Sequence, residues 1–134
     1  CTTQLAMLRK VSLLVGLLMW GTFSSLDKFV YVDKNLKAFV MSVEHVVFKF
    51  NEAQEDPFLY KVLRIWRSKR QFSTETYLID LEMGRTMCKK QDDDLDNCLL
   101  QQEIGRRKVR CTYFVRTLEW ITQFSIVNST CDQI

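Results

Sequence analysis

The sequence predicts an α+β fold in which one long helix is wrapped by an antiparallel sheet of four to five strands. Residues 36–53 place apolar side chains at three- and four-residue steps, as a half-buried helix does. Several later segments alternate apolar and polar residues with a period of two, as half-buried strands do. Helix and sheet would each cover the other's apolar face, and 134 residues suffice for one such domain.

The first segment in chain order has the three-part pattern of a secretory signal peptide. A basic start at residues 7–10 precedes an apolar run at 11–20, and small and polar residues follow at 21–25. The apolar run is shorter than the about 20 residues that a membrane-spanning helix needs. We expect residues 1–24 to comprise upstream residues plus the signal peptide, and residues 25–134 to form the folded domain. The alternative is an amphipathic or buried first helix.

The predicted helix follows this segment. Its apolar side carries Leu36, Phe39, Val40, Val43, Val46, Val47 and Phe50. Its polar side would carry Lys37, Ser42, Glu44, Lys49, Asn51 and Glu52. Asp33 or Asn35 could cap its start, and Asp56 before Pro57 would end it, because a residue that precedes proline avoids the helical region.

The remaining chain favours strands. Residues 60–66 mix aromatic and branched side chains, and residues 77–83 and 109–116 show a period of two, with an apolar residue at every second position. A last strand is expected at 121–127, with Phe124 and Ile126 on one face.

Composition and charge exclude several classes of partner. The formal net charge is +3, and removal of residues 1–24 would lower it, so neither nucleic acid nor an anionic membrane is indicated as a partner. We therefore expect no nucleic acid, no membrane span, no cofactor and no metal. His45, the only histidine, is most simply a helix residue, and the sequence supports no catalytic nucleophile.

Four cysteines beyond Cys1 fit a disulfide framework in an exported domain: Cys88, Cys98, Cys111 and Cys131. They allow three pairings. Sequential pairing would close loops of 10 and 20 residues, each bridge contributing about 3 kcal/mol. Zinc is the rival explanation, but the chain has no CxxC pair and His45 lies far upstream.

The chain resembles the type 2 cystatins. The resemblance rests on the helix end at 50–53 (FNEA), on LEMGRTMC at 81–88, on Asp96-Asn97-Cys98, and on cysteine steps of ten and twenty residues. It implies the cystatin fold, secretion and the pairs Cys88–Cys98 and Cys111–Cys131. Cystatins of this family inhibit papain-like cysteine proteases with a three-part wedge: an N-terminal glycine, a Gln-x-Val-x-Gly hairpin and a Pro-Trp hairpin tip.

This chain departs from the wedge in all three places. Residues 25–35 contain no glycine. The first hairpin falls on Arg70, Gln71, Phe72, Ser73 and Thr74, and counting from Gln71 instead gives Gln-Phe-Ser-Thr-Glu, which also lacks the valine and the glycine.

At the second tip Trp120 is present, but Glu119 replaces the proline. A carboxylate entering an apolar subsite must be desolvated, which is costly unless it is paired. Some cystatins also inhibit the asparaginyl protease legumain, through a second site that needs an asparagine in the loop after the helix. Glu55 occupies the matching position in this chain. These departures resemble the reproductive-tract branch of the family, the CRES- and testatin-like cystatins, with a C-terminal run closer to the testatin, or cystatin-nine-like, side.

Three further motifs have simple interpretations. Asn128-Ser129-Thr130 is a glycosylation sequon. The acidic run at 92–96 lacks the glycine-centred loop of a Ca²⁺ site and favours a solvated loop. Basic residues could form a glycan-binding patch, namely Arg64, Arg67, Lys69, Arg70, Arg106, Arg107, Lys108 and Arg110.

We expect a secreted, non-enzymatic cystatin-like protein that inhibits papain-like cysteine proteases weakly or not at all and acts by binding in the reproductive tract. The alternative is a working inhibitor of papain-like cysteine proteases that relies on Trp120 and a remodelled first loop. A further alternative is an antimicrobial or glycan-binding protein. A monomer or a domain-swapped dimer is expected.

Overall fold

The structure is a computed structural model that describes residues 27–92, 95–118, 120 and 122–134. The predicted signal segment at 1–24 lies outside the described residues. The elements, in chain order, are β1 (Phe29–Tyr31), α2 (Lys37–Ala53), β2 (Phe58–Gln71), β3 (Thr76–Lys89), the 3₁₀ turn η1 (Leu95–Asn97), β4 (Lys108–Leu118) and β5 (Gln123–Gln133).

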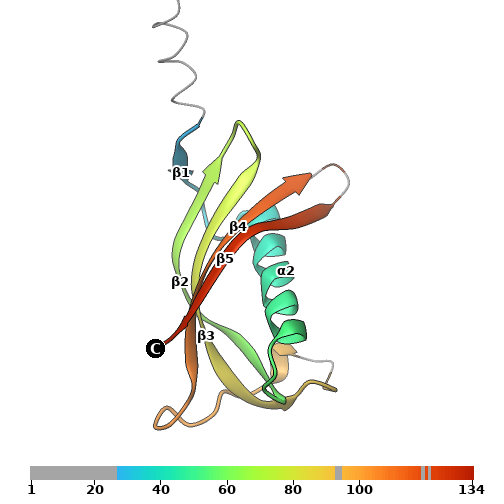
Figure 1. The fold of residues 1–134 in the computed structure, drawn as a ribbon, viewed down its shortest axis with the longest axis vertical. Coiled ribbons are helices and arrows are strands. Elements are labelled where there is room, and N and C mark those ends of the chain that lie inside the picture. Colours follow the sequence, from blue (N-terminus) through green and yellow to red (C-terminus); the bar gives the residue numbers. More distant parts are fainter. Residues whose placement is uncertain (1–26, 93–94, 119, 121) are drawn as a thin grey trace, which may run out of the picture.

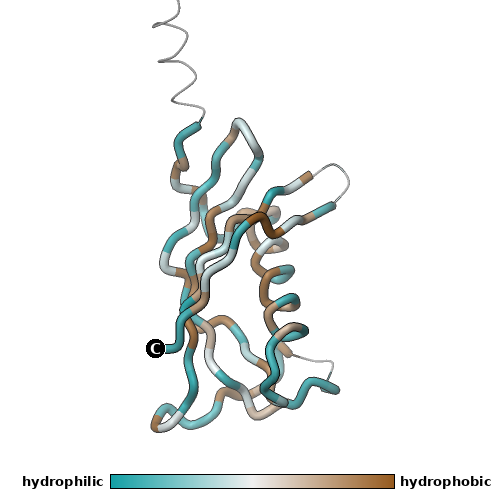
Figure 2. The backbone as a smooth tube through the Cα atoms, in the orientation of Figure 1, coloured by the Kyte–Doolittle hydropathy of each residue, from teal (hydrophilic) through white to brown (hydrophobic). Residues whose placement is uncertain are grey.

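The sheet has five strands in the order β1-β2-β3-β4-β5, and every neighbouring pair is antiparallel. It curls around α2, which lies against its inner face (Figure 1). Hydrophobic residues concentrate in α2 and along the strands, whereas the loops are mostly hydrophilic (Figure 2). The predicted α+β fold, with one helix wrapped by an antiparallel sheet, is confirmed.

The helix matches its prediction in position but not in its cap. It starts at Lys37, and Leu36 occupies the cap position without a side-chain capping bond. Asp33 instead accepts a hydrogen bond from the backbone N–H of Asn35 on its carboxylate, so the expected Asp33 or Asn35 cap is wrong. The helix ends at Ala53, before Asp56-Pro57, because Gln54 is already extended.

Two residues assigned to the polar side of the helix are buried. The Ser42 hydroxyl donates to the Ala38 carbonyl at 2.8 Å, which satisfies it inside the helix. The Asn51 side chain accepts from the Tyr60 N–H at 2.8 Å and donates to the Tyr60 carbonyl at 2.9 Å. Asn51 therefore fastens α2 to the start of β2, which a local polarity pattern does not reveal.

The core lies between α2 and the inner face of the sheet. Phe39 and Val46 from the helix meet alternate residues of β3 and β4, and the Phe39 and Tyr77 rings pack edge to face, 5.8 Å between centroids. The fully buried side chains of the two strands include Tyr77, Ile79, Leu81, Met83, Cys111 and Val115. The period of two predicted for these strands is therefore the inner–outer alternation of the sheet.

Both disulfides fasten the sheet. Cys111 and Cys131 are directly paired residues of β4 and β5, with 4.1 Å between their Cα atoms. Cys88 and Cys98 close the loop that follows β3, with 5.7 Å between their Cα atoms. The pairing is the one that the family resemblance implies.

Candidate functional site

Three segments meet at one end of the molecule, at the top of Figure 1. They are β1 with the preceding Asp27, the β2–β3 turn at 72–75, and the β4–β5 turn that includes Trp120. We call these three segments the hairpin edge. Because consecutive turns of an antiparallel meander alternate between the two ends of the sheet, the strand order brings the β2–β3 and β4–β5 turns to the same end.

The first turn contains the predicted contact residues Phe72, Ser73 and Thr74, and Gln71 closes it by pairing with Thr76. The Thr74 hydroxyl donates to the side-chain oxygen of Gln71 at 2.6 Å, which braces the turn. Phe72 is half exposed, and the Arg70 guanidinium stacks on its ring at 4.7 Å. The turn therefore presents an aromatic ring and polar side chains to solvent.

Glu75 has the left-handed backbone angle φ of +50°, which side chains other than glycine adopt reluctantly. Its carbonyl accepts two hydrogen bonds from Thr117, from the N–H at 2.9 Å and from the hydroxyl at 3.1 Å. Thr117 is fully buried on β4. These bonds hold Glu75 in place and link the first hairpin to the second.

The segment before β1 is tied to the first turn. The Gln71 side-chain amide donates to the Asp27 carbonyl at 2.5 Å, and the Ser73 hydroxyl donates to the Asp27 carboxylate at 2.8 Å. β1 itself pairs with β2 at Phe29–Gln71 through Tyr31–Lys69. Two side-chain contacts and a short ladder thus hold this segment beside the turn.

The second turn exposes its aromatic residue. Trp120 is 80% exposed, and Leu118, which ends β4, is 38% exposed. Thr122 has a φ of +50°, so each hairpin has a residue other than glycine in a left-handed conformation. Glu119 lies outside the described residues.

The outer face of the sheet holds an ionic cluster that the sequence did not identify. The Asp80 carboxylate is 1% exposed and accepts from the Arg67 Nε at 2.8 Å and from two nitrogens of Arg110 at 3.0 and 3.1 Å. Burial alone would raise the pKa of Asp80, but the hydrogen bonds from Arg110 and Arg67 lower it below its ordinary value. Asp80 stands directly opposite Arg67 in the register, a pairing that only the strand alignment reveals.

A second carboxylate anchors the other end of the sheet. Asp56 accepts from the Phe58 N–H at 3.0 Å, the Tyr60 hydroxyl at 2.9 Å and the Arg85 guanidinium at 2.8 Å. Burial opposes ionisation of Asp56, yet these bonds lower its pKa. Arg85 comes from the GRT motif, so this motif serves to hold the loop after the helix.

The predicted basic patch divides between different regions. Arg64 and Arg110 lie over the Trp66 ring, at 4.7 and 4.9 Å from its centroid, next to Arg67 on the outer face. Elsewhere, Arg70 stacks on Phe72, Arg106 donates to the Gln101 carbonyl, and Arg107 approaches Asp56 at 4.0 Å.

Other predicted features have simple positions. Asn128 is exposed on β5, opposite Phe114 of β4. His45 lies on α2 beside the Phe124 ring, and burial with the nearby Lys49 charge lowers its pKa.

No group of three or more His, Cys, Asp or Glu side chains within the described ranges could hold a metal ion. Among the described helices, none is long and apolar enough to cross a membrane.

Comparison with known proteins assigns the family. A family model of the cystatin domain matches residues 29–120, and the chain belongs to the cystatin family. It is 57% identical to mouse Cystatin-12, over 95% of this chain and 99% of that protein, and 37% identical to human Cystatin-9-like, over 67% and 63%. The crystal structure of dimeric human cystatin F superposes with a TM-score of 0.71 at 27% identity, covering 80% of this chain and 87% of that one.

These matches confirm the predicted cystatin fold and the type 2, reproductive-tract branch of the family. The predicted contact residues that the structure describes, residues 70–74 and Trp120, all lie at or beside the hairpin edge.

Proposed function

We propose that this protein is a secreted, non-enzymatic cystatin that inhibits papain-like cysteine proteases weakly or not at all and acts by binding through its folded surface. One observation carries the proposal. Glu75, with its left-handed backbone, takes the position of the wedge glycine when the motif is counted from Gln71. The first turn therefore carries a charged side chain where the family motif has glycine.

The physical consequence is a cost at the contact surface. A glycine lets the backbone approach a partner closely, whereas the Glu75 side chain adds bulk and a charge that must be desolvated. Ser73 replaces the apolar valine, and Glu119 replaces the proline at the second tip. Tight inhibition would have to rely on Trp120, whose exposed indole keeps a large apolar surface available for some partner.

The tie between Asp27 and the first turn supports the same conclusion. The wedge of the family uses a flexible N-terminal trunk, but here the segment is fastened beside the turn by Gln71 and Ser73. Reaching into an enzyme cleft would require breaking those hydrogen bonds. At the other end of the molecule Glu55 is exposed in the loop after α2, where inhibition of legumain would need asparagine.

The proposal is tested by adding the purified, disulfide-bonded protein to papain and cathepsin L whose active-site concentrations are known, and measuring the remaining protease activity. We expect inhibition constants above about 1 μM, corresponding to less than about 8 kcal/mol of binding free energy. Nanomolar inhibition of either protease would overturn the proposal and favour the alternative, a working inhibitor that relies on Trp120.

Secretion and glycosylation are tested by expression in mammalian cells. The disulfides and the signal pattern support export, and we expect the secreted chain to begin near Ser25. We expect a glycan at Asn128, detected as a mass decrease after enzymatic deglycosylation that is absent from the Asn128→Gln variant. We expect the protein to act in the reproductive tract, as a monomer or a domain-swapped dimer.

A second candidate function is binding of an anionic glycan on the outer face. A hollow of about 280 Å³ there is lined by Tyr31, Lys34, Ile65, Trp66, Arg67, Ser68 and Lys69. Its exposed aromatic rings and cations suit sugar rings and sulfate groups. Retention on heparin that falls steeply with salt and is lost in Lys34→Ala/Lys69→Ala would support it.

A further inference from the structure

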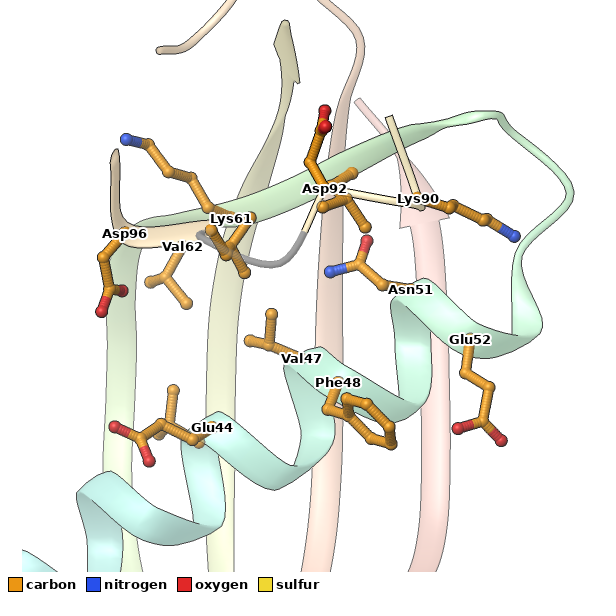
Figure 3. Close-up of a pocket in the computed structure, with 13 residues that line it drawn as sticks. Glu44, Val47, Phe48, Asn51, Glu52, Lys61, Val62, Lys90, Asp92 and Asp96 are labelled. Atoms are coloured by element: carbon orange, nitrogen blue, oxygen red, sulfur yellow. The ribbon is translucent and has the colours of Figure 1, made fainter. Parts of the chain in front are cut away.

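A cavity of about 780 Å³ opens between α2, the start of β2 and four residues that lie between the cysteines of the Cys88–Cys98 bridge, Lys90, Asp92, Leu95 and Asp96 (Figure 3). Small-molecule sites in proteins are typically clefts of about 300–1,000 Å³ with a mostly apolar lining. The elements that line it, the second half of α2, the start of β2 and the loop after β3, lie toward the opposite end of the molecule from the hairpin edge (Figure 1). A ligand here would leave the hairpin edge uncovered.

The floor of the cavity is apolar. It is built by side chains of the helix, the strand and the loop, namely Val43, Val47, Leu59, Val62 and Leu95, with the exposed Phe48 ring at its margin. The one amide in the lining, Asn51, already exchanges two hydrogen bonds with the Tyr60 backbone. The floor therefore suits a hydrocarbon chain better than a polar group.

The rim is charged, and its lysines are engaged. The Lys61 ammonium donates a hydrogen bond to the Cys98 carbonyl at 2.6 Å, and the Lys90 ammonium donates one to the Gln54 carbonyl. These contacts direct both ammonium groups at backbone carbonyls. The carboxylates of the rim outnumber the lysines and are Glu44, Glu52, Asp92 and Asp96.

Of the four rim carboxylates, Glu44 and Asp96 are placed to meet a ligand, whereas Glu52 and Asp92 already have partners. Glu52 lies 3.9 Å from Lys49, and Asp92 accepts the Lys89 N–H. Glu44 and Asp96 form no ion pair within the part of the chain that the structure describes, and they lie at the same end of the opening in Figure 3. A cation bound at this end would neutralise both.

We propose that this cavity binds a small amphiphilic cation, a single alkyl chain with an amine or quaternary ammonium head. The chain packs on Val47 and Val62, and the head lies between Glu44 and Asp96. An anionic amphiphile of the same length meets the same floor but is repelled by the carboxylates.

The proposal gives the Cys88–Cys98 disulfide a specific purpose. The loop that it closes supplies Lys90, Asp92, Leu95 and Asp96 to the cavity wall. Without the bridge this wall would no longer be held at the end of β3. Ligand binding should therefore depend on this disulfide, whereas the Cys111–Cys131 bridge continues to hold the sheet.

Calorimetric titration of the secreted protein with decyltrimethylammonium, decanol and decyl sulfate, each below its micelle concentration, tests the proposal. We expect saturable one-to-one binding of decyltrimethylammonium, weaker binding of decanol and no binding of decyl sulfate. Amide shifts in NMR should map to residues 43–52 and 59–62.

Variants sharpen the test. Glu44→Gln/Asp96→Asn should weaken decyltrimethylammonium binding about tenfold, a loss of about 1.4 kcal/mol, while the exposed loop control Glu103→Gln leaves it unchanged. Val62→Phe, which fills the cavity, should abolish binding with the circular dichroism spectrum retained.

Three results would overturn the proposal: no saturable binding of the cation, equal affinity for decyl sulfate, or shifts confined to the hairpin edge. None of them bears on protease inhibition, because the two sites lie at opposite ends of the fold.

Discussion

We call α2 and the strands β2 to β5, without their turns, the body of the molecule. The body and the hairpin edge differ in how well each residue suits its position. In the body, Phe39 and Val46 are fully buried and the Asn51 amide is satisfied by the Tyr60 backbone. At the edge, Glu75 and Thr122 adopt left-handed backbone angles that suit glycine better. Trp120, also at the edge, leaves 80% of its surface in water.

The fold therefore rests on the buried residues of the body, and the exposed side chains at the two hairpin tips contribute little to it. The core, the ladders and the disulfides hold the sheet around α2 without any contribution from the Trp120 ring. Substitutions at the tips can therefore change what the protein binds while the fold persists. Strained backbone angles of this kind cluster at active sites and ligand-binding regions.

The greatest loss of stability is expected when a disulfide of the body is removed. Cys111→Ala/Cys131→Ala removes the bridge between β4 and β5, which closes a 20-residue loop. We expect the free energy of unfolding to fall by about 3 kcal/mol. Urea unfolding measures it. A loss below about 1 kcal/mol would mean that the sheet does not rely on this bridge.

A smaller loss is expected when the outer-face cluster is broken. Asp80→Asn removes the charge that Arg67 and Arg110 share, and should lower the free energy of unfolding by about 2 kcal/mol at pH 7. The exposed control Asp132→Asn should change it by less than about 0.5 kcal/mol. Comparable losses in the two variants would argue against a special role for Asp80.

The same cluster predicts a pH dependence. Because the pKa of Asp80 is lowered in the folded state, its stabilisation is complete above the ordinary aspartate value of 3.8 and is lost as pH falls through the folded pKa. The unmodified protein should therefore lose stability below about pH 4 more steeply than Asp80→Asn. The pKa of Asp56 is lowered as well, so the Asp80→Asn variant keeps part of the pH dependence of stability.

Relieving strain at the edge should have the opposite sign. Glu75→Gly places glycine at a φ of +50°, and we expect about 1 kcal/mol of added stability, or about 4 °C in Tm. Glu103→Gly is the matched control, because Glu103 is an exposed loop residue without a positive φ, and it should destabilise slightly. Equal shifts of the two variants in thermal unfolding would show that the Glu75 turn is unstrained.

The smallest change in stability is expected at the second tip. Trp120→Ala should alter the free energy of unfolding by less than about 0.5 kcal/mol, since the indole is mostly exposed. Guanidinium unfolding checks this value. A loss above about 1 kcal/mol would show that Trp120 contributes to the body.

The sequence predicted the elements whose patterns are local. The apolar spacing at 36–53 located α2 to within a residue, and alternation at 77–83 located the centre of β3. β2 was predicted at 60–66 but extends to Gln71, because a run of basic residues hides its alternation. β1 has three residues and is defined only by its pairing with β2.

What could not be predicted depends on partners far away in the chain. Asp80 is buried because β2 and β4 bring Arg67 and Arg110 to it from either side. Ser42 and Asn51 look like surface residues in a helical pattern, yet each finds a backbone partner inside the protein. At the hairpin edge the sequence located the turn and its substitutions, but only the backbone angles identify Glu75 as the strained position.

The decisive experiment restores the family's residues at the two hairpins and measures inhibition. Ser73→Val, Glu75→Gly and Glu119→Pro, combined in one chain, return the residues that the family resemblance implies at the two hairpins of the wedge. We predict that papain inhibition by this variant tightens at least about a hundredfold relative to the unmodified protein, about 2.7 kcal/mol. Glu103→Gly is the control and should show no gain. A restored variant with an intact fold and unchanged inhibition would contradict the view that the altered residues of the hairpin edge are what weakens inhibition.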